Sequence, residues 1–389
     1  MSEWEKLVND NVQSIEVSGI RQFFNRVSEV PNAVQLTLGQ PDFPTPDHVK
    51  EAAIQAIKEG KTTYTPNAGI LPLRKAASRF LHTNYNLNYD PQMEVITTVG
   101  ASEALDLVMR TLINEGDEVI VPAPAYPAYE SLIRMRGAEP VWVDTRETQF
   151  KLTAEALQRK ITSNTKAVIL SYPSNPTGVT LNEQELQAIV DVLVNQQIFV
   201  ISDEIYSELV YEGTMVSIAS IPKMKERTFV VNGVSKSHSM TGWRIGFLFG
   251  PASLMKQVLK VHQYNVSCAS SVSQYAALQA LEHGQDDPQV MREAYQKRRD
   301  YMMERLEAMN LPFASPSGAF YLFVSIEKTG LSSFEFADRL LNEAQLAAVP
   351  GTAFSTYGEG FIRISYAYSM DNLKEAADRL ETFVKRFNV

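Results

Sequence analysis

Residues 167–201 read AVILSYPSNPTGVTLNEQELQAIVDVLVNQQIFVI. The apolar runs at the two ends, 167–170 and 198–201, are short and uninterrupted, which is typical of strands buried on both faces of a parallel sheet. Between them, Asn182 followed by Glu185 has the pattern of a capping box that opens a helix through Val194. A strand, a helix and a second strand in this order predict a βαβ unit, which indicates an α/β fold.

The same alternation continues on both sides of this unit. Five further apolar strands are expected at 95–98, 118–121, 141–143, 228–231 and 245–249. With the two strands above they predict a large domain with a mostly parallel seven-stranded sheet, covered by helices on both faces. Ligands bind beyond the carboxyl ends of such strands, so the residues directly after each strand are the first candidates for a site.

The last third of the chain has a different pattern. After a break at 284–288, a long charged helical pattern runs to about Met309, followed by shorter strands at 320–324 and 361–366 and a final amphipathic helix. This predicts a smaller α+β domain. The first 45 residues contain Gly and Pro turns rather than a sheet pattern, and we expect them to pack with it. The predicted domains are therefore 46–285, and 1–45 together with 286–389.

The composition of the 389-residue chain argues against several classes of function. Hydrophobic residues make up 44% and charged residues 21%, and the net charge is -9. An acidic chain lacks the basic surface that nucleic acids or anionic lipids require. Cys268 is the single cysteine and the five histidines show no ligand spacing, so neither a disulfide nor a metal site is expected. Without a basic and apolar leader, we expect a cytoplasmic protein.

Chemically useful residues follow the predicted strands. Each has an ordinary alternative, such as a helix start, a packed loop, a turn, a helix cap or a surface charge. Taken in order along the chain, they are Gly100-Ala101-Ser102 at a helix start, Tyr126 in a proline-rich loop, Asn175 in a turn, Asp203 and Tyr206, Ser235 and Lys236, and Arg244. Together they suit a cofactor with a phosphate, an aromatic ring, a phenolic oxygen, a ring nitrogen and an aldehyde. Pyridoxal 5'-phosphate has these groups.

Three motifs then point to a family. Residues 174–178 (SNPTG), 202–206 (SDEIY) and 235–246 (SKSHSMTGWRIG) resemble class I/II aminotransferases of PLP fold type I. The likeness runs from Leu38 to Ala367. It implies transfer of an amino group between an amino acid and a 2-oxo acid, with glutamate and 2-oxoglutarate as the expected pair. Segments 64–69 and 261–271 resemble the branch that acts on N-acetyl-LL-diaminopimelate in lysine biosynthesis.

The resemblance also implies roles at the cofactor ring. Lys236 would hold pyridoxal phosphate covalently and move the substrate proton, and Asp203 would pair with the ring nitrogen. Tyr206 and Asn175 would bind the phenolic oxygen, and Tyr126 would stack on the ring. In this family the Asn175–Pro176 peptide bond is often cis, and we expect it to be cis here.

At the phosphate and the substrate the resemblance implies further contacts. The phosphate would meet Gly100, Ala101, Ser102, Ser235 and Arg244, and also Tyr64 of a second subunit, which implies a homodimer with shared sites. Many relatives carry a serine where this chain has Gly233, so one phosphate contact is absent or supplied elsewhere.

The substrate carboxylate would bind Arg363, with help from Asn175 and Gly39, and residues 318–321 would line the substrate side. Arg21 is a candidate for a distal carboxylate, although a solvated helix charge explains it equally well. Segment 261–275 has no Arg or Lys, which makes a pure aspartate enzyme less expected.

The sequence is also compatible with other functions. An aromatic or aspartate aminotransferase, or a PLP-dependent C–S lyase, would use the same lysine and aspartate. A PLP-fold sensor domain of a transcription regulator is disfavoured by the acidic charge and by the short stretch before Gly39.

Overall fold

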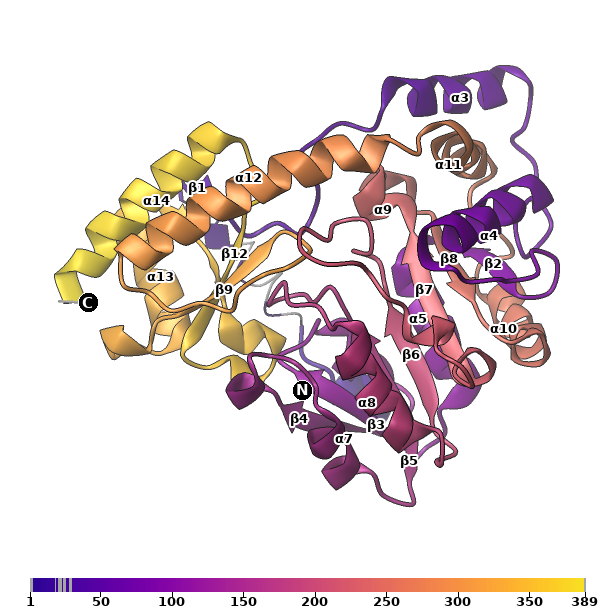
Figure 1. Cartoon of the computed structure of the whole chain (residues 1–389), viewed down its shortest axis with the longest axis horizontal. Coiled ribbons are helices and arrows are strands. Elements are labelled where there is room, and N and C mark those ends of the chain that lie inside the picture. Colours follow the sequence, from indigo (N-terminus) through magenta and orange to yellow (C-terminus); the bar gives the residue numbers. More distant parts are fainter. Residues whose placement is uncertain (1–2, 18, 20–22, 24–25, 28–29, 388–389) are drawn as a thin grey trace.

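A computed structural model describes residues 3–17, 19, 23, 26–27 and 30–387 (Figure 1). A seven-stranded sheet has the order β2-β8-β7-β6-β5-β3-β4. β8 is antiparallel to β2 and β7, and the other neighbours are parallel, so the predicted mostly parallel sheet is confirmed. The strands are β2 Val95–Thr98, β3 Glu118–Ala123, β4 Glu139–Asp144, β5 Thr165–Ser171, β6 Phe199–Asp203, β7 Thr228–Gly233 and β8 Gly246–Phe249.

Alternating side chains of β5 pack against helices on opposite faces of the sheet. Ala167 and Ile169 of β5 belong to a core shared with α5, α6 and α10. Val168 and Leu170 belong to a core shared with α7 and α8. The helices of this part are α3 Asp47–Lys58, α4 Leu71–Tyr85, α5 Gly100–Leu112, α6 Ala128–Arg134, α7 Ala154–Lys160, α8 Glu183–Leu193, α9 Val234–Ser237, α10 Ala252–Asn265 and α11 Ser271–His283.

The predicted capping box at the start of α8 is present. The Glu185 backbone N–H donates to Asn182 Oδ1 at 2.9 Å, and the Asn182 N–H donates to Glu185 Oε2 at 2.8 Å. These bonds satisfy two N–H groups that a helix start leaves without intrahelical partners. They fix the point at which the chain passes from the turn after β5 into α8. Asn175 lies in that turn.

A second, smaller group of elements lies beside the large sheet (Figure 1). Its antiparallel sheet has the order β11-β12-β9, and its long helix α12 spans from α11 to α14. The elements are β9 Tyr321–Ser325, β10 Leu346–Ala347, β11 Val349–Pro350, β12 Phe361–Ser365, α12 Asp287–Ala308, α13 Ser333–Ala344 and α14 Met370–Val384. The proposed domain boundaries stay a prediction.

One expectation about the N-terminal segment was wrong. A short strand, β1 Val34–Gln35, pairs in parallel with β10, where no sheet pattern was expected. Two-residue strands leave no periodic signal, because the pairing depends on backbone bonds such as Leu36 N–H to Ala347 C=O at 2.9 Å.

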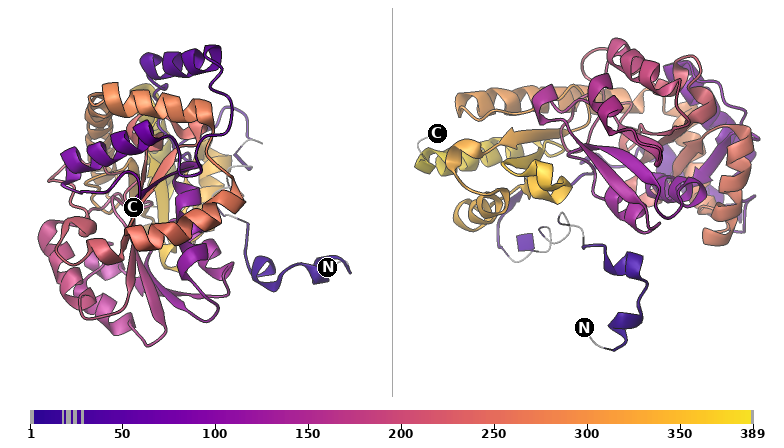
Figure 2. Two further views of the ribbon diagram at one scale, coloured as in Figure 1. Left: turned by 90° about the vertical axis from the view of Figure 1, so that its right-hand side faces the viewer. Right: turned by 90° about the horizontal axis from the view of Figure 1, so that it is seen from below.

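The start of the chain has a different character from the rest. Figure 2 shows residues 3–17, including α1 (Asp10–Gln13), reaching away from the layered body. Trp4 is 79% exposed and Leu7 is 76% exposed. No helix within the described ranges is long and apolar enough to cross a membrane.

Candidate active site

A cavity of about 350 Å³ opens at the carboxyl edge of the large sheet, where the smaller elements meet it. Because β8 is antiparallel, its first residue, Gly246, pairs with the last residues of β2 and β7. The loop before β8 therefore reaches the same edge. The cavity brings together these predicted residues: Gly39, Ala101, Ser102, Tyr126, Asn175, Asp203, Tyr206, Ser235, Lys236, Arg244 and Arg363.

Some predicted residues are not part of this cavity lining. Gly100 lies next to the lining residue Ala101 but is not in the lining, and of residues 318–321 only Tyr321 lines the cavity. Tyr64 is 88% exposed and lies outside the cavity lining of its own chain. Arg21 lies outside the described residues.

Lys236 lies in α9, directly after β7. Its Nζ donates to the Gly39 carbonyl at 2.6 Å, which ties the large sheet to the N-terminal segment. Withdrawal from water, and then the positive charges of Arg244 and Arg363, lower the pKa of Lys236 to about 8. About a tenth of the amine is therefore unprotonated at pH 7, far more than for an ordinary lysine, which suits it to act as a nucleophile or a base.

Asp203 ends β6 and is 6% exposed. Its Oδ2 accepts from the Tyr129 hydroxyl at 2.7 Å, and its Oδ1 accepts from the Ile205 N–H at 3.2 Å. Burial raises the pKa of Asp203. Its hydrogen-bond donors among the described residues include no cation, although the charge of Lys236 acts on it, and Asp203 lines the cavity.

Sequence reasoning missed Tyr129. It lies on α6 three residues after Tyr126, and the two rings meet edge to face with centroids 5.6 Å apart. Ser171 Oγ lies 2.8 Å from the Tyr129 hydroxyl and donates to it, because the single phenolic proton goes to Asp203. In the sequence Tyr129 is indistinguishable from a core aromatic, since only the fold places its hydroxyl beside Asp203.

Arg363 in β12 is the largest of the fully buried side chains. Its Nη1 donates to Asn175 Oδ1 at 2.9 Å and its Nη2 donates to the Thr37 carbonyl at 2.6 Å. Its guanidinium carbon lies 4.4 Å from the Tyr321 ring centroid and 4.9 Å from that of Phe354. Its Nε, although buried, has no hydrogen-bond partner among the described residues. A buried cation with a free N–H indicates an anionic ligand.

Two tyrosines complete the wall beside Arg363. The hydroxyls of Tyr206 and Tyr321 are 2.7 Å apart, and burial raises the pKa of both. A side chain at Gly39 would collide with the Tyr321 hydroxyl, so glycine allows the backbone to lie directly against Tyr321. The Asn175–Pro176 peptide bond is cis, as predicted.

Comparison with known proteins identifies the family. Residues 31–380 match Aminotransferase class I and II. The chain belongs to the class I and II aminotransferases. It is 55% identical, over 98% of its length and 96% of the relative, to a probable N-acetyl-LL-diaminopimelate aminotransferase of Bacillus subtilis.

Solved structures agree with this assignment. An aspartate aminotransferase from Thermus thermophilus with maleate superposes with a TM-score of 0.92 at 37% identity, covering 96% of this chain and 99% of that one. An aromatic aminotransferase from Pyrococcus horikoshii has a TM-score of 0.90 at 39% identity, covering 94% and 99%. The predicted fold, enzyme class and aminotransferase activity are confirmed.

The family implies pyridoxal 5'-phosphate, and the cavity of this aminotransferase fits it. The start of α5 and Arg244 form an anion site: Gly100 has φ +75°, and any side chain there would collide with the Arg244 guanidinium. Lys236 offers an amine for the aldehyde. Asp203 offers a buried carboxyl with no cationic hydrogen-bond donor among the described residues, which matches a protonated ring nitrogen. Arg363 Nε remains for a substrate carboxylate.

Proposed function

We propose that this aminotransferase exchanges the amino group between N-acetyl-LL-diaminopimelate and the glutamate/2-oxoglutarate pair, as a step of lysine biosynthesis. One observation supports the chemistry above all: Lys236, Asp203 and Arg363 line a single cavity. The substrate is supported by the Bacillus subtilis relative, which covers almost the whole chain at 55% identity.

Each residue then has a distinct task. When bound, the cofactor supplies an aldehyde that takes the amino group and a ring that accepts electrons. Asp203 holds a proton on the ring nitrogen, with Tyr129 keeping its carboxylate oriented. Lys236 Nζ, once free, removes the proton from the substrate α-carbon. Arg363 fixes the substrate carboxylate so that the α-carbon faces Lys236.

The remaining groups hold the cofactor in place. The backbone from Gly100 to Ser102, the Ser235 hydroxyl and Arg244 would bind the phosphate, and Tyr126 would cover the ring. Tyr206 and Asn175 would bind the phenolic oxygen. Gly39 would help to bind the substrate carboxylate, and Arg21 stays our candidate for the distal carboxylate.

Lys236 makes the uptake of cofactor depend on pH. Only the unprotonated amine attacks an aldehyde, and the pKa of Lys236 is lowered to about 8. The rate at which the apoprotein takes up pyridoxal 5'-phosphate should therefore rise with pH and level off above about pH 8. Stopped-flow absorbance measures this rate, with Lys236→Ala as the control for non-covalent binding. A rate that falls with pH would contradict the assignment.

We propose a cytoplasmic homodimer with shared sites. Tyr64 and Tyr264 are 88% and 87% exposed, Trp4 and Leu7 are 79% and 76% exposed, and a second copy would cover such groups. Tyr64 of one subunit then reaches the phosphate in the other. Its replacement by phenylalanine removes one charge-assisted hydrogen bond, so cofactor affinity should fall roughly tenfold.

Hybrid dimers test the sharing directly. If Tyr64 serves the partner's site, a dimer of Tyr64→Phe and Lys236→Ala subunits holds one site with both residues intact. At a cofactor concentration that leaves the Tyr64→Phe homodimer mostly empty, mixing the two variants after mild dissociation should then restore activity above that of either homodimer. No recovery, with hybrid formation shown by native mass spectrometry, would mean that each subunit supplies its own Tyr64.

A panel of amino donors tests the proposed substrate. The holoenzyme is mixed with N-acetyl-LL-diaminopimelate, aspartate, phenylalanine or alanine, and the formation of glutamate from 2-oxoglutarate is measured. We expect the acetylated diamino acid to react fastest, with unacetylated LL-diaminopimelate as the matched control. Preference for aspartate or phenylalanine would favour the alternatives that other relatives represent. Release of pyruvate and ammonia without an acceptor would indicate a lyase.

A further inference from the structure

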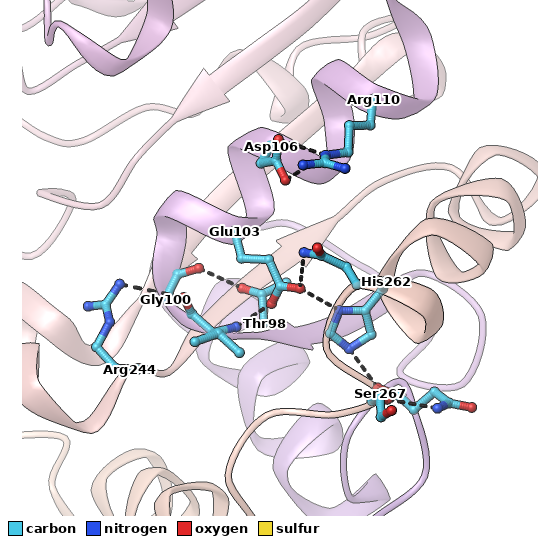
Figure 3. Close-up of polar contacts among 11 residues, drawn as sticks. Thr98, Gly100, Glu103, Asp106, Arg110, Arg244, His262 and Ser267 are labelled. Carbon is cyan, nitrogen blue, oxygen red and sulfur yellow. Dashed lines mark hydrogen bonds and ion pairs between the residues drawn. The ribbon is translucent and has the colours of Figure 1, made fainter. Parts of the chain in front are cut away.

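A buried carboxyl and a buried imidazole meet behind the start of α5. Glu103, in the first turn of α5, is 8% exposed, and His262, on α10, is 0% exposed. Glu103 Oε1 lies 3.1 Å from His262 Nδ1 (Figure 3). Neither side chain lines the cavity, so the proposed reaction leaves the pair without a task.

The hydrogen bonds determine how many protons the pair holds. His262 Nε2 lies 2.9 Å from the Asn67 carbonyl, which only accepts, so Nε2 carries a proton. The Glu103 carboxyl also accepts from the Val99 N–H at 2.6 Å and from Asn265 Nδ2 at 3.3 Å. With Nε2 already protonated, the contact between Glu103 Oε1 and His262 Nδ1 holds one further proton, so the two side chains together carry no net charge.

This pair adjoins the anion site at the start of α5. Val99, the residue before the helix, is held through both of its peptide units: Glu103 accepts its N–H, and Arg244 Nη2 lies 3.5 Å from its carbonyl oxygen. In Figure 3, Gly100 lies between Arg244 on one side and Glu103 with His262 on the other. A carboxylate in the first turn of a helix competes with a bound anion for the same positive helix end. His262 neutralises that competitor.

The other end of the pair reaches the segment that carries Tyr64. His262 binds the Asn67 carbonyl, and Asn67 Nδ2 donates to the Ser267 carbonyl at 2.7 Å. Gln274 holds the same segment at Ile70 N, at 2.8 Å, and at Thr65 Oγ1, at 2.9 Å. His262 is thus a bridge between this segment and the helix start of its own subunit.

We infer that Glu103 and His262 form a buried ion pair that positions the start of α5 and sets its affinity for the cofactor phosphate. The inference rests on the proposed placement of the phosphate at Gly100–Ser102 and Arg244. It makes both side chains positioning residues. His262 contributes by cancelling the charge of Glu103, and Glu103 contributes by fixing the Val99 peptide.

Three variants separate charge from packing. His262→Gln leaves the Glu103 carboxylate buried without its cation, next to the phosphate site. Glu103→Gln removes the charge, but its amide can still accept from Val99 and donate to a neutral His262. The double variant E103Q/H262Q carries neither charge. Arg110→Gln is the matched control, because Arg110 pairs with Asp106 on the same helix at 2.8 Å, away from the phosphate (Figure 3).

The experiment measures the dissociation constant of pyridoxal 5'-phosphate for each apoprotein by equilibrium titration, together with the thermal midpoint. His262→Gln should weaken binding roughly tenfold, a change that corresponds to about 1.4 kcal/mol. Glu103→Gln and Arg110→Gln should stay close to the wild type, and E103Q/H262Q should bind more tightly than His262→Gln. Hydrogen exchange of the peptide that contains Val99 should rise in His262→Gln.

Opposite results would overturn the inference. If His262→Gln binds the cofactor as tightly as the wild type, or if the double variant binds no better than His262→Gln, the pair has only a structural role. Should His262→Gln not fold, the cofactor affinities of Glu103→Leu and Glu103→Gln are compared instead. Leucine cannot accept the Val99 N–H, so Glu103→Leu should bind the cofactor more weakly. Equal affinities would overturn the inference. A wild-type protein that binds no pyridoxal phosphate would instead refute the proposed function.

Discussion

Lys236→Ala is expected to lower the rate of amino transfer by about 10⁴-fold or more, since it removes both the covalent attachment of the cofactor and the base at the α-carbon. Withdrawal from water lowers the pKa of Lys236 to about 8, which is what a base working near neutral pH requires. The effect should fall on kcat, because the substrate carboxylate still binds Arg363. Single-turnover kinetics with N-acetyl-LL-diaminopimelate measure the loss.

Two controls make this result specific to the amine. Lys260→Ala, on the helix α10 and outside the cavity, should retain the wild-type rate. Adding a small primary amine to Lys236→Ala should recover part of the activity, since a free amine can enter the vacated space and take the proton. An unchanged rate in Lys236→Ala would exclude it as the base, whatever the cofactor content.

The large sheet could be predicted from the sequence because its strands are buried on both faces. Such strands read as unbroken apolar runs, and the run at 95–98 coincides with β2. Residues just after these runs form most of the cavity lining, because parallel strands all end at one edge of the sheet. Asp203 and Lys236 could therefore be predicted as site residues. The capping box at Asn182 could be predicted from neighbouring residues alone.

Contacts between distant elements could not be predicted in this way. The ring of Phe354 lies against Arg363, yet it comes from a short 3₁₀ turn with no pattern of its own. The Thr37 carbonyl that accepts from Arg363 belongs to the backbone, which carries no residue signature. Tyr321 was expected on the substrate side, but its contact with the Tyr206 hydroxyl depends on how β9 meets the large sheet. The pairing of Glu103 with His262 likewise joins two helices far apart in the chain.

A conservative replacement should weaken substrate binding most at Arg363. The guanidinium carbon lies 4.4 Å from the Tyr321 ring centroid and 4.9 Å from that of Phe354, and its two terminal nitrogens bind Asn175 and Thr37. Burial lowers the pKa of Arg363, but a guanidinium still stays charged. A lysine has one rotating ammonium, so it cannot keep both bonds, the stack and a paired contact with a carboxylate.

Arg363→Lys should therefore lower kcat/KM for the amino acid roughly 100-fold, the equivalent of one or two charge-assisted hydrogen bonds. The substrate carboxylate carries the same charge in the ground state and the transition state, so the change should appear mainly as a higher KM. Arg299→Lys is a suitable control: Arg299 is also buried, lies 5.1 Å from the Tyr211 ring centroid and donates to the Pro316 carbonyl, but is outside the cavity. It should affect thermal stability and leave KM unchanged. An Arg363→Lys enzyme with wild-type KM would place the carboxylate elsewhere.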